Sequence, residues 1–305
     1  MTAPDTALEP ALAAKPQTPF QRFLADFFDS KIATAGLVVL AIILFVAIFA
    51  PWISPQNPYD LSKLDIMDGR LEPGTKSMDG KPFLLGTDDQ GRDMLSAIFY
   101  GLRTSLAVGV TASFCAMILG MTMGLTAAYF GGLVETIIMR IVDIQLSFPS
   151  ILIALILLAV LGQGVDKIII ALIAVQWAYY ARTTRGTALV ERRKEYIEAA
   201  QCLALGDRRV VFRHLFPNCL PPIIVVNTVL IANAIALEAT LSFLGLGLPI
   251  TEPSLGLLIA NGFTYLLSGK YWISFFPGVA LLFTIVSINL VGDQLRDVLN
   301  PRLQK

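Results

Sequence analysis

The segment from Ile32 to Ile53 constrains this chain most, because it is a long apolar run without a single charged side chain. The hydrocarbon core of a bilayer is about 30 Å thick and is crossed by roughly 20 mostly apolar helical residues. The run therefore predicts a transmembrane helix. A cleaved signal peptide is the alternative, but the run is too long for one, begins after a Pro- and Ala-rich tail and lacks a small-residue cleavage site.

Five further stretches have the apolar character of membrane spans. They are Ser105–Tyr129, Ile137–Leu161, Ile168–Tyr180, Pro222–Leu246 and Trp272–Val291. The fourth is short and contains Gln176, and we expect it to continue through Arg182. Only 15% of the residues are charged, whereas soluble domains average about 25%. The predicted fold class is all-α: a polytopic membrane protein with six transmembrane helices.

Six spans place both termini on one side of the membrane. With the N-terminus inside, the inner segments hold more Lys and Arg than the outer ones, including Arg192-Arg193-Lys194 and Arg208-Arg209. Because cytoplasmic loops carry an excess of these residues, both termini are predicted to be cytoplasmic.

Composition also argues against several function classes. The formal net charge is zero and no Lys/Arg-rich block stands out, so no nucleic-acid partner is expected. Three scattered cysteines and a lone histidine, His214, provide neither a disulfide framework nor a metal site. The only Gly-Lys pairs, at Lys81 and Lys270, are followed by Pro and Tyr, so neither is a phosphate-binding loop. We predict no catalytic residue, no metal ligand and no cofactor in this chain, which is therefore not expected to be an enzyme.

The stretch between the fourth and fifth spans combines charge with helical periodicity. In Glu195–Gly206, small and apolar residues occupy positions 199, 202, 203 and 206, which form one face of a helix. We expect Gly206 to end this helix in the left-handed conformation and Asp207 to cap a second helix that stops near Pro217. The pattern alone favours equally a docking element for another protein and an amphipathic linker on the membrane surface.

Residues of this stretch resemble the EAA loop of ABC importer permeases. The match comprises Glu198-Ala199-Ala200, then Gly206, then Leu215-Phe216-Pro217-Asn218. The resemblance implies a coupling helix that docks in a groove of a cytoplasmic ATPase. The coupling residues it implies are Glu198, Ala199, Ala200, Leu203, Gly206 and Pro217.

Two further motifs narrow the resemblance to the dipeptide/oligopeptide/nickel permeases, and within them to the C-type subunit that is similar to the dipeptide permease. Leu85–Asp93 reads LGTDDQGRD and resembles the LGTDxxGRD signature, giving the motif residues Gly86, Thr87, Asp88, Gly91, Arg92 and Asp93. Leu241–Gly247 followed by Pro253–Gly256 resembles the LSFLGLG…PxWG region, except that Leu255 stands where the family has tryptophan.

The resemblance implies the type I ABC importer permease fold in a bacterial inner membrane. It divides the chain into a cytoplasmic tail (1–31), a first transmembrane helix (32–53), a periplasmic loop or cap (54–103), a five-helix permease core (104–295) with a cytoplasmic coupling loop (191–221), and a cytoplasmic tail (296–305). The implied partners are a homologous second permease, two ABC ATPase subunits that bind the ATP and Mg, a periplasmic or extracellular substrate-binding protein, and membrane lipid. The implied function is ATP-driven import of di- or oligopeptides; nickel, glutathione, an opine or an oligosaccharide is the alternative solute.

Polar residues within the spans are candidate path residues, since ionisable groups there are expensive. Asn227 and Glu238 lie eleven residues apart, about three helical turns, and so share one face, with Asn233 well off it. Two interpretations stay open. Both side chains line the transport path or gate; alternatively, Glu238 lies near the outer end of a shorter span and is bonded to neighbouring backbone or to the partner permease. Arg140 and Asp143 can pair on one helix. Gly120 and Gly124 predict close helix packing.

Two rival classes fit the sequence less well. A stand-alone secondary transporter would show inverted repeats and midplane charges. A membrane enzyme would need a cluster of His, Asp or Glu side chains, which the sequence lacks. The outer loop itself fits either a docking surface for a binding protein or a plain solvated loop.

Overall fold

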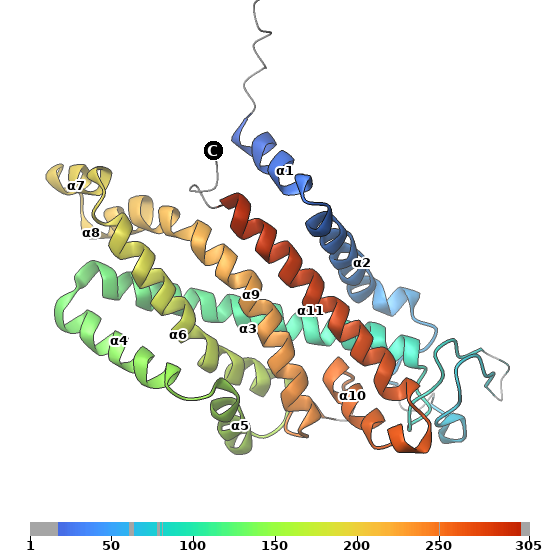
Figure 1. The fold of residues 1–305 in the computed structure, drawn as a ribbon. Coiled ribbons are helices and arrows are strands. Elements are labelled where there is room, and N and C mark those ends of the chain that lie inside the picture. The colour runs from blue at the N-terminus through green and yellow to red at the C-terminus, as the bar shows by residue number, and fades with distance from the viewer. Residues whose placement is uncertain (1–17, 61–63, 78–79, 81, 250, 300–305) are drawn as a thin grey trace, which may run out of the picture.

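A computed structural model describes residues 18–60, 64–77, 80, 82–249 and 251–299, and in these ranges the chain is all-helical apart from two isolated β-bridges (Figure 1). The longer helices are α1 (Pro19–Asp29), α2 (Lys31–Ile53), α3 (Met94–Phe130), α4 (Gly132–Leu146), α5 (Ser150–Leu161), α6 (Val165–Glu191), α7 (Glu195–Cys202), α9 (Phe216–Phe243), α10 (Leu255–Phe263) and α11 (Trp272–Leu299). The short helical pieces are Ile66–Asp68, α8 (Asp207–Arg209), the π-helical segment Val210–Leu215 and Leu266–Ser268.

The first predicted span is confirmed as α2. Its N-cap is Ser30, whose hydroxyl accepts a hydrogen bond from the backbone N–H of Ala33 at 3.3 Å. Before it, the predicted tail contains a helix of its own, α1, which begins with a capping box formed by Thr18 and Gln21. The remainder of that tail, residues 1–17, and residues 300–305 lie outside the described ranges.

Among the residues that the structure describes, length and apolarity identify four helices able to cross a membrane, or five if one bent pair counts as a span. The four are α2, α3, the run Asp207–Phe243 and α11. The third predicted span, Ile137–Leu161, is not one continuous helix, because α4 and α5 meet at an angle of 91°. Pro149 directly precedes α5, and proline cannot continue the hydrogen-bond ladder of α4.

The fourth span is longer than Ile168–Tyr180, because α6 continues well beyond Arg182.

Close packing of α3 against α6 is confirmed at the two glycines that predicted it. A Cβ atom on Gly120 would lie 2.4 Å from the carbonyl oxygen of Trp177, and one on Gly124 would lie 2.5 Å from that of Ala181. Only glycine therefore lets these backbones approach so closely. Gln176 is buried at this contact, where its amide donates to the carbonyl of Leu230 at 2.9 Å.

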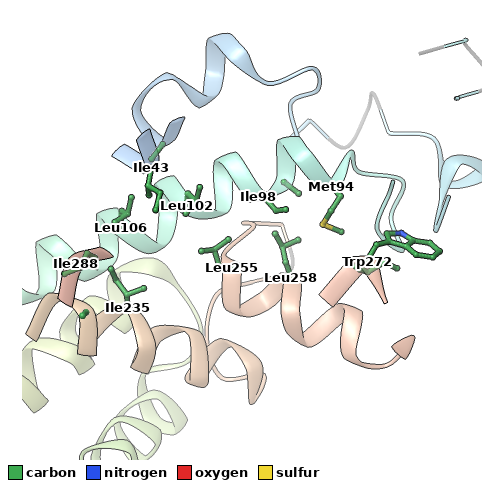
Figure 2. Packing of buried hydrophobic residues seen from close by; sticks show 14 residues of the cluster. Ile43, Met94, Ile98, Leu102, Leu106, Ile235, Leu255, Leu258, Trp272 and Ile288 are labelled. Atoms are coloured by element: carbon green, nitrogen blue, oxygen red, sulfur yellow. The ribbon is translucent and has the colours of Figure 1, made fainter. Parts of the chain in front are cut away.

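Side chains from five helices form the largest apolar cluster (Figure 2). Leu102 and Leu106 of α3 pack there with Ile43 of α2 and Ile235 of α9. Leu255, which stands at the family's tryptophan position, is fully buried in the same cluster. This cluster fixes α2, α3, α9, α10 and α11 relative to one another.

Two ends of the bundle result from this arrangement. The segments α7 and α8, the helix α1 and the last turns of α11 lie toward one end, while the loop before α3 and the helix α10 lie toward the opposite end (Figure 1). We call these the coupling end and the loop end. Helix α3 begins at Met94, so the loop that precedes it is shorter than the predicted 54–103.

Candidate functional site

The coupling end presents the face that the periodicity singled out. Glu198 and Ala199 of α7 are exposed, as are Gly206 and Pro217, and the side chain of Leu203 is 74% exposed. Ala200 is the exception among the predicted coupling residues: it is only 4% exposed and packs inward beside Ile197. Helix α7 thus has a buried inner face and a free outer face of small and apolar side chains.

The turn between α7 and α8 differs from the prediction. Ala204, not Gly206, adopts the left-handed conformation, with φ 53°. Gly206 has φ −60° and ψ 144° and is the N-cap of α8, so Asp207 is the first helical residue rather than the cap. The helix α7 ends two residues earlier than Ala204, and the left-handed position follows that end rather than the glycine.

The predicted stop at Pro217 is also wrong. The chain from Asp207 through Val210–Leu215 to Phe243 forms one helical run of 37 residues. Pro217 is the second residue of α9, which directly follows the π-helical segment, and the helical run continues through it. The π-helical segment before it changes the hydrogen-bond register, and such turns are frequent at functional positions. The coupling end is therefore joined to the membrane part of α9 without a break.

Contacts at the coupling end hold the start of this run. The hydroxyl of Tyr129, near the end of α3, donates to Asp207 Oδ1 at 2.5 Å. Arg192, just after α6, donates from Nη1 to the carbonyl oxygen of Ala128 at 2.9 Å and lies over the Tyr129 ring. The hydroxyl of Tyr196 donates to Glu191 at 2.8 Å, and burial together with this carboxylate raises the pKa of Tyr196.

Two ion pairs join α4 to α6 nearby. Asp143 accepts from Arg182 at 2.5 Å, and Glu135 accepts from the Nε of Arg185 at 2.7 Å. The predicted pairing of Asp143 with Arg140 is therefore wrong. The spacing of residues along one helix does not predict an ion-pair partner on a neighbouring helix.

A groove of about 960 Å³ opens between α6, α9 and α11. Asn233 and Thr240 of α9 are exposed in it, opposite Tyr179 and Thr183 of α6. The remaining lining residues are Ser150, Val175, Gln176, Pro221, Pro222, Val225, Val226, Val229, Leu230, Ala236, Leu237, Gly292, Asp293, Arg296 and Leu299. The groove combines apolar walls with neutral hydroxyl and amide groups and with the charged side chains of Asp293 and Arg296.

Asn227 and Glu238, the residues predicted for the path, do not line this groove. Asn227 accepts from the hydroxyl of Tyr180 at 2.7 Å. Glu238 is fully buried and accepts from Ser105 of α3 at 2.9 Å and from Ser242 of its own helix at 2.8 Å. Both side chains connect α9 to the rest of the bundle, and the groove is lined instead by Asn233, which the helical spacing had placed off their face.

The LGTDDQGRD motif at the loop end forms a buried, hydrogen-bonded cluster. Arg92 Nε donates to Asp88 Oδ2 at 2.7 Å, and both side chains are 0% exposed. Burial raises the pKa of Asp88, although the guanidinium of Arg92 opposes this shift. Asp93 is the N-cap of α3, and Gly91 has φ +76°. Gly86 and Thr87 are buried as well, so all six predicted motif residues are internal.

Trp272, which is far from the motif in the sequence, also belongs to this cluster. Its indole N–H donates to the carbonyl oxygen of Thr87 at 3.2 Å, which ties the start of α11 to the motif. Neither this bond nor the Tyr129–Asp207 bond has a local sequence signal, because the partners are far apart in the chain.

Comparisons with known proteins agree with one another. Residues 116–305 match the family described as binding-protein-dependent transport system inner membrane component, and residues 18–73 match the N-terminal TM domain of oligopeptide transport permease C. The dipeptide transport system permease protein DppC of Escherichia coli K12 is 42% identical over 294 residues, which is 96% of each chain. A putative peptide transport system permease protein of Brucella suis biovar 1 is 40% identical over 269 residues, covering 88% of this chain and 87% of the relative.

A solved structure shares the fold. A chain of the inward-facing MetNI methionine ABC transporter superposes with a TM-score of 0.55 at 20% identity. The match covers 68% of this chain and 98% of the other. Similarity at this level of identity concerns the arrangement of the helices.

Proposed function

The chain belongs to the family of binding-protein-dependent transport permeases, the membrane components of ABC importers, in its dipeptide and oligopeptide branch, and from this premise we propose that it is a permease subunit for ATP-driven import of di- or oligopeptides. The observation that carries the proposal is the single helical run Asp207–Phe243. One end of this run adjoins the exposed face of α7, and its membrane part forms a wall of the groove.

In this proposal the groove is one half of the transport path. A homologous permease supplies the other half and closes the open side. Asn233, Thr240 and Tyr179 then face the solute, and their neutral donors and acceptors suit a peptide backbone, which offers both N–H and C=O groups. Asn227 and Glu238 act behind the path by holding α9 to Tyr180 and Ser105.

Energy enters at the coupling end. Two ATPase subunits, which bind ATP and Mg, work beneath the two permeases, and one docks on Glu198, Ala199, Leu203 and Gly206. Their closure moves α7 and α8 as a rigid element, and the path switches between inward- and outward-facing states. This end, with both termini, is cytoplasmic.

The loop end faces the periplasm and receives the substrate-binding protein. Because the LGTDDQGRD residues are buried, their part in this docking is to shape the loop rather than to touch the partner. Exposed apolar side chains of the same loop, such as Ile66, Met67 and Leu84, are available for contact. Apolar side chains exposed at an end of the molecule favour a protein partner over a plain solvated loop.

Docking at α7 is tested by charge placed on its outer face. We expect Ala199→Arg and Leu203→Arg to abolish co-purification of the ATPases and ATP-driven uptake in the reconstituted complex, because both positions are exposed and lie away from the inner packing of Ala200. Leu267→Arg, a fully exposed leucine at the loop end, is the matched control and should retain the ATPases. If the two α7 variants keep ATPase binding and uptake intact, the coupling assignment is wrong.

The identity of the solute is tested on the partner. Mass spectrometry of the ligand that co-purifies with the binding protein should give short peptides. Nickel, glutathione, an opine or an oligosaccharide in that position would replace the peptide assignment while leaving the permease role in place. Uptake that persists in vesicles without any ATPase would instead favour a secondary transporter.

A further inference from the structure

Three chain segments meet at the coupling end around one tyrosine. Tyr129 lies in the last turn of α3, Asp207 begins the helical run to Phe243, and Arg192 follows the end of α6. The Tyr129 hydroxyl bonds to Asp207 at 2.5 Å, while the Arg192 guanidinium carbon lies 5.8 Å from the centre of the Tyr129 ring. Arg192 also bonds to the carbonyl oxygen of Ala128 at 2.9 Å. We call Tyr129, Arg192 and Asp207 the tyrosine junction.

The position of the junction matters because of what surrounds it. The outer face of α7 is exposed, and the turn that leads from it to Asp207 contains the left-handed Ala204 and an unpacked Gly206. No heavy atom lies within 4 Å of a Cβ built on Gly206. Asp207 is thus the first residue after the turn that is fixed to another helix by a hydrogen bond between side chains.

A second path from α7 to the bundle is apolar. Ile197 and Ala200 pack in a cluster with Leu215 and Cys219 of the same helical run. Apolar packing is non-directional, so it keeps these elements together without fixing the rotation of the run about its own axis. A short hydrogen bond to a charged group is directional and stronger than a neutral one. Farther along the run, Ser105 of α3 bonds to Glu238 and Ser113 of α3 bonds to the carbonyl oxygen of Leu230. At the first turn of the run, the hydrogen bond of Tyr129 to Asp207 is the directional contact with α3.

We propose that Tyr129 and Arg192 are positioning residues for energy coupling. They hold the first turn of the run Asp207–Phe243 against α3. A displacement of α7 therefore rotates or shifts the part of α9 that lines the groove, instead of being absorbed by the turn Ala204–Gly206. This inference rests on the proposed function, because it needs a motor at the coupling end. It adds residues outside the predicted coupling set. These residues are expected to affect the amount of peptide imported per ATP hydrolysed rather than the docking of the ATPases.

The experiment uses the complete reconstituted transporter with its ATPases and binding protein. We expect Tyr129→Phe, which removes the hydroxyl and keeps the ring beneath Arg192, to lower peptide imported per ATP hydrolysed roughly tenfold, as for the loss of a hydrogen bond to a charged group. ATPase co-purification and the rate of ATP hydrolysis should stay close to those of the wild type. Asp207→Ala should give a similar loss, and the double variant should be no worse than either single one, because both remove the same bond.

Thr122→Val is the matched control on α3, since its hydroxyl bonds only to carbonyl oxygens of its own helix. It should leave the import-to-hydrolysis ratio unchanged. An unchanged ratio in Tyr129→Phe, or losses in the two single variants that add in the double variant, would overturn the inference. Loss of ATPase binding in Tyr129→Phe would overturn it as well, by making the residue part of the docking surface. A wild-type complex without ATP-driven uptake would refute the proposed function itself, so the two failures are distinguishable.

Discussion

Two regions of this molecule carry family motifs and use them in opposite ways. At the loop end, the LGTDDQGRD residues turn inward: Asp88 and Arg92 are completely buried and Asp93 caps α3. At the coupling end, Glu198, Ala199 and Gly206 face outward. A family motif can therefore consist of buried residues that stabilise the fold or of exposed residues that contact a partner. The burial of its side chains shows which of the two roles it has. The difference predicts that substitutions at the loop end change folding, while those at the coupling end change assembly.

The largest effect is expected from the buried ion pair. Asp88→Ala removes the carboxylate that lies 2.7 Å from the buried Arg92 guanidinium, and removal of one partner of a buried pair destabilises a protein by about 3–5 kcal/mol. Unfolding of the detergent-solubilised subunit by heat or denaturant measures this loss. Glu198→Ala, an exposed carboxylate at the coupling end, should change stability by less than about 0.5 kcal/mol. Equal losses in the two variants would erase the distinction between the ends.

A smaller contrast is expected between two glycines. Gly91 has φ +76°, and a Cβ there would lie 2.2 Å from the carbonyl oxygen of Asp65. Gly91→Ala should therefore destabilise the fold by about 2 kcal/mol or more. Gly206 has an ordinary φ of −60° and open space around it, so Gly206→Ala should be neutral or stabilising by up to about 1 kcal/mol. The same unfolding measurement applies, and a destabilised Gly206→Ala variant would contradict the described turn.

The smallest effect concerns Ala204, the non-glycine residue in the left-handed conformation at the coupling end. Ala204→Gly removes a steric cost of roughly 1–2 kcal/mol but makes the unfolded chain more flexible, so a net stabilisation of about 0.5 kcal/mol is expected. Ala199→Gly, in the regular helix α7, should have the opposite sign and cost roughly 0.5–1 kcal/mol. Two losses of equal size would show that strain at Ala204 is absent.

Much of the fold follows from local patterns. The charge-free run predicted α2 almost to the residue, and Gly120 and Gly124 predicted the contact of α3 with α6. The exposed face of α7 followed from the spacing of positions 199, 202, 203 and 206. Each of these signals is local in the sequence, and within a helix the periodicity determines which side chains share a face.

The errors share a physical cause, because tertiary context overrode a local rule. Pro217 was expected to end a helix, but the helical run continues through it, just after the wider turn of Val210–Leu215. For Glu238 the sequence left open a place in the path or a bond to neighbouring backbone or to the partner permease, but Ser105, 133 positions away in the sequence, binds its carboxylate inside the bundle. The 91° bend after α4 has a local cause in Pro149, but the Gln145 amide before the bend binds the carbonyl of Val175 on α6, 30 positions away. Such partners cannot be read from residues nearby in the chain.

The unbroken run from Asp207 to Phe243 has a consequence for how this sequence can vary. Each residue turns an α-helix by about 100°, so the run fixes an angular phase between Asp207 at the tyrosine junction and Asn233 in the groove. A one-residue insertion or deletion between them would turn one of these two side chains away from its place, even if every other residue were kept. The wider turn of Val210–Leu215 is part of that phase. In this stretch the number of residues is as much a determinant of the site as their identity.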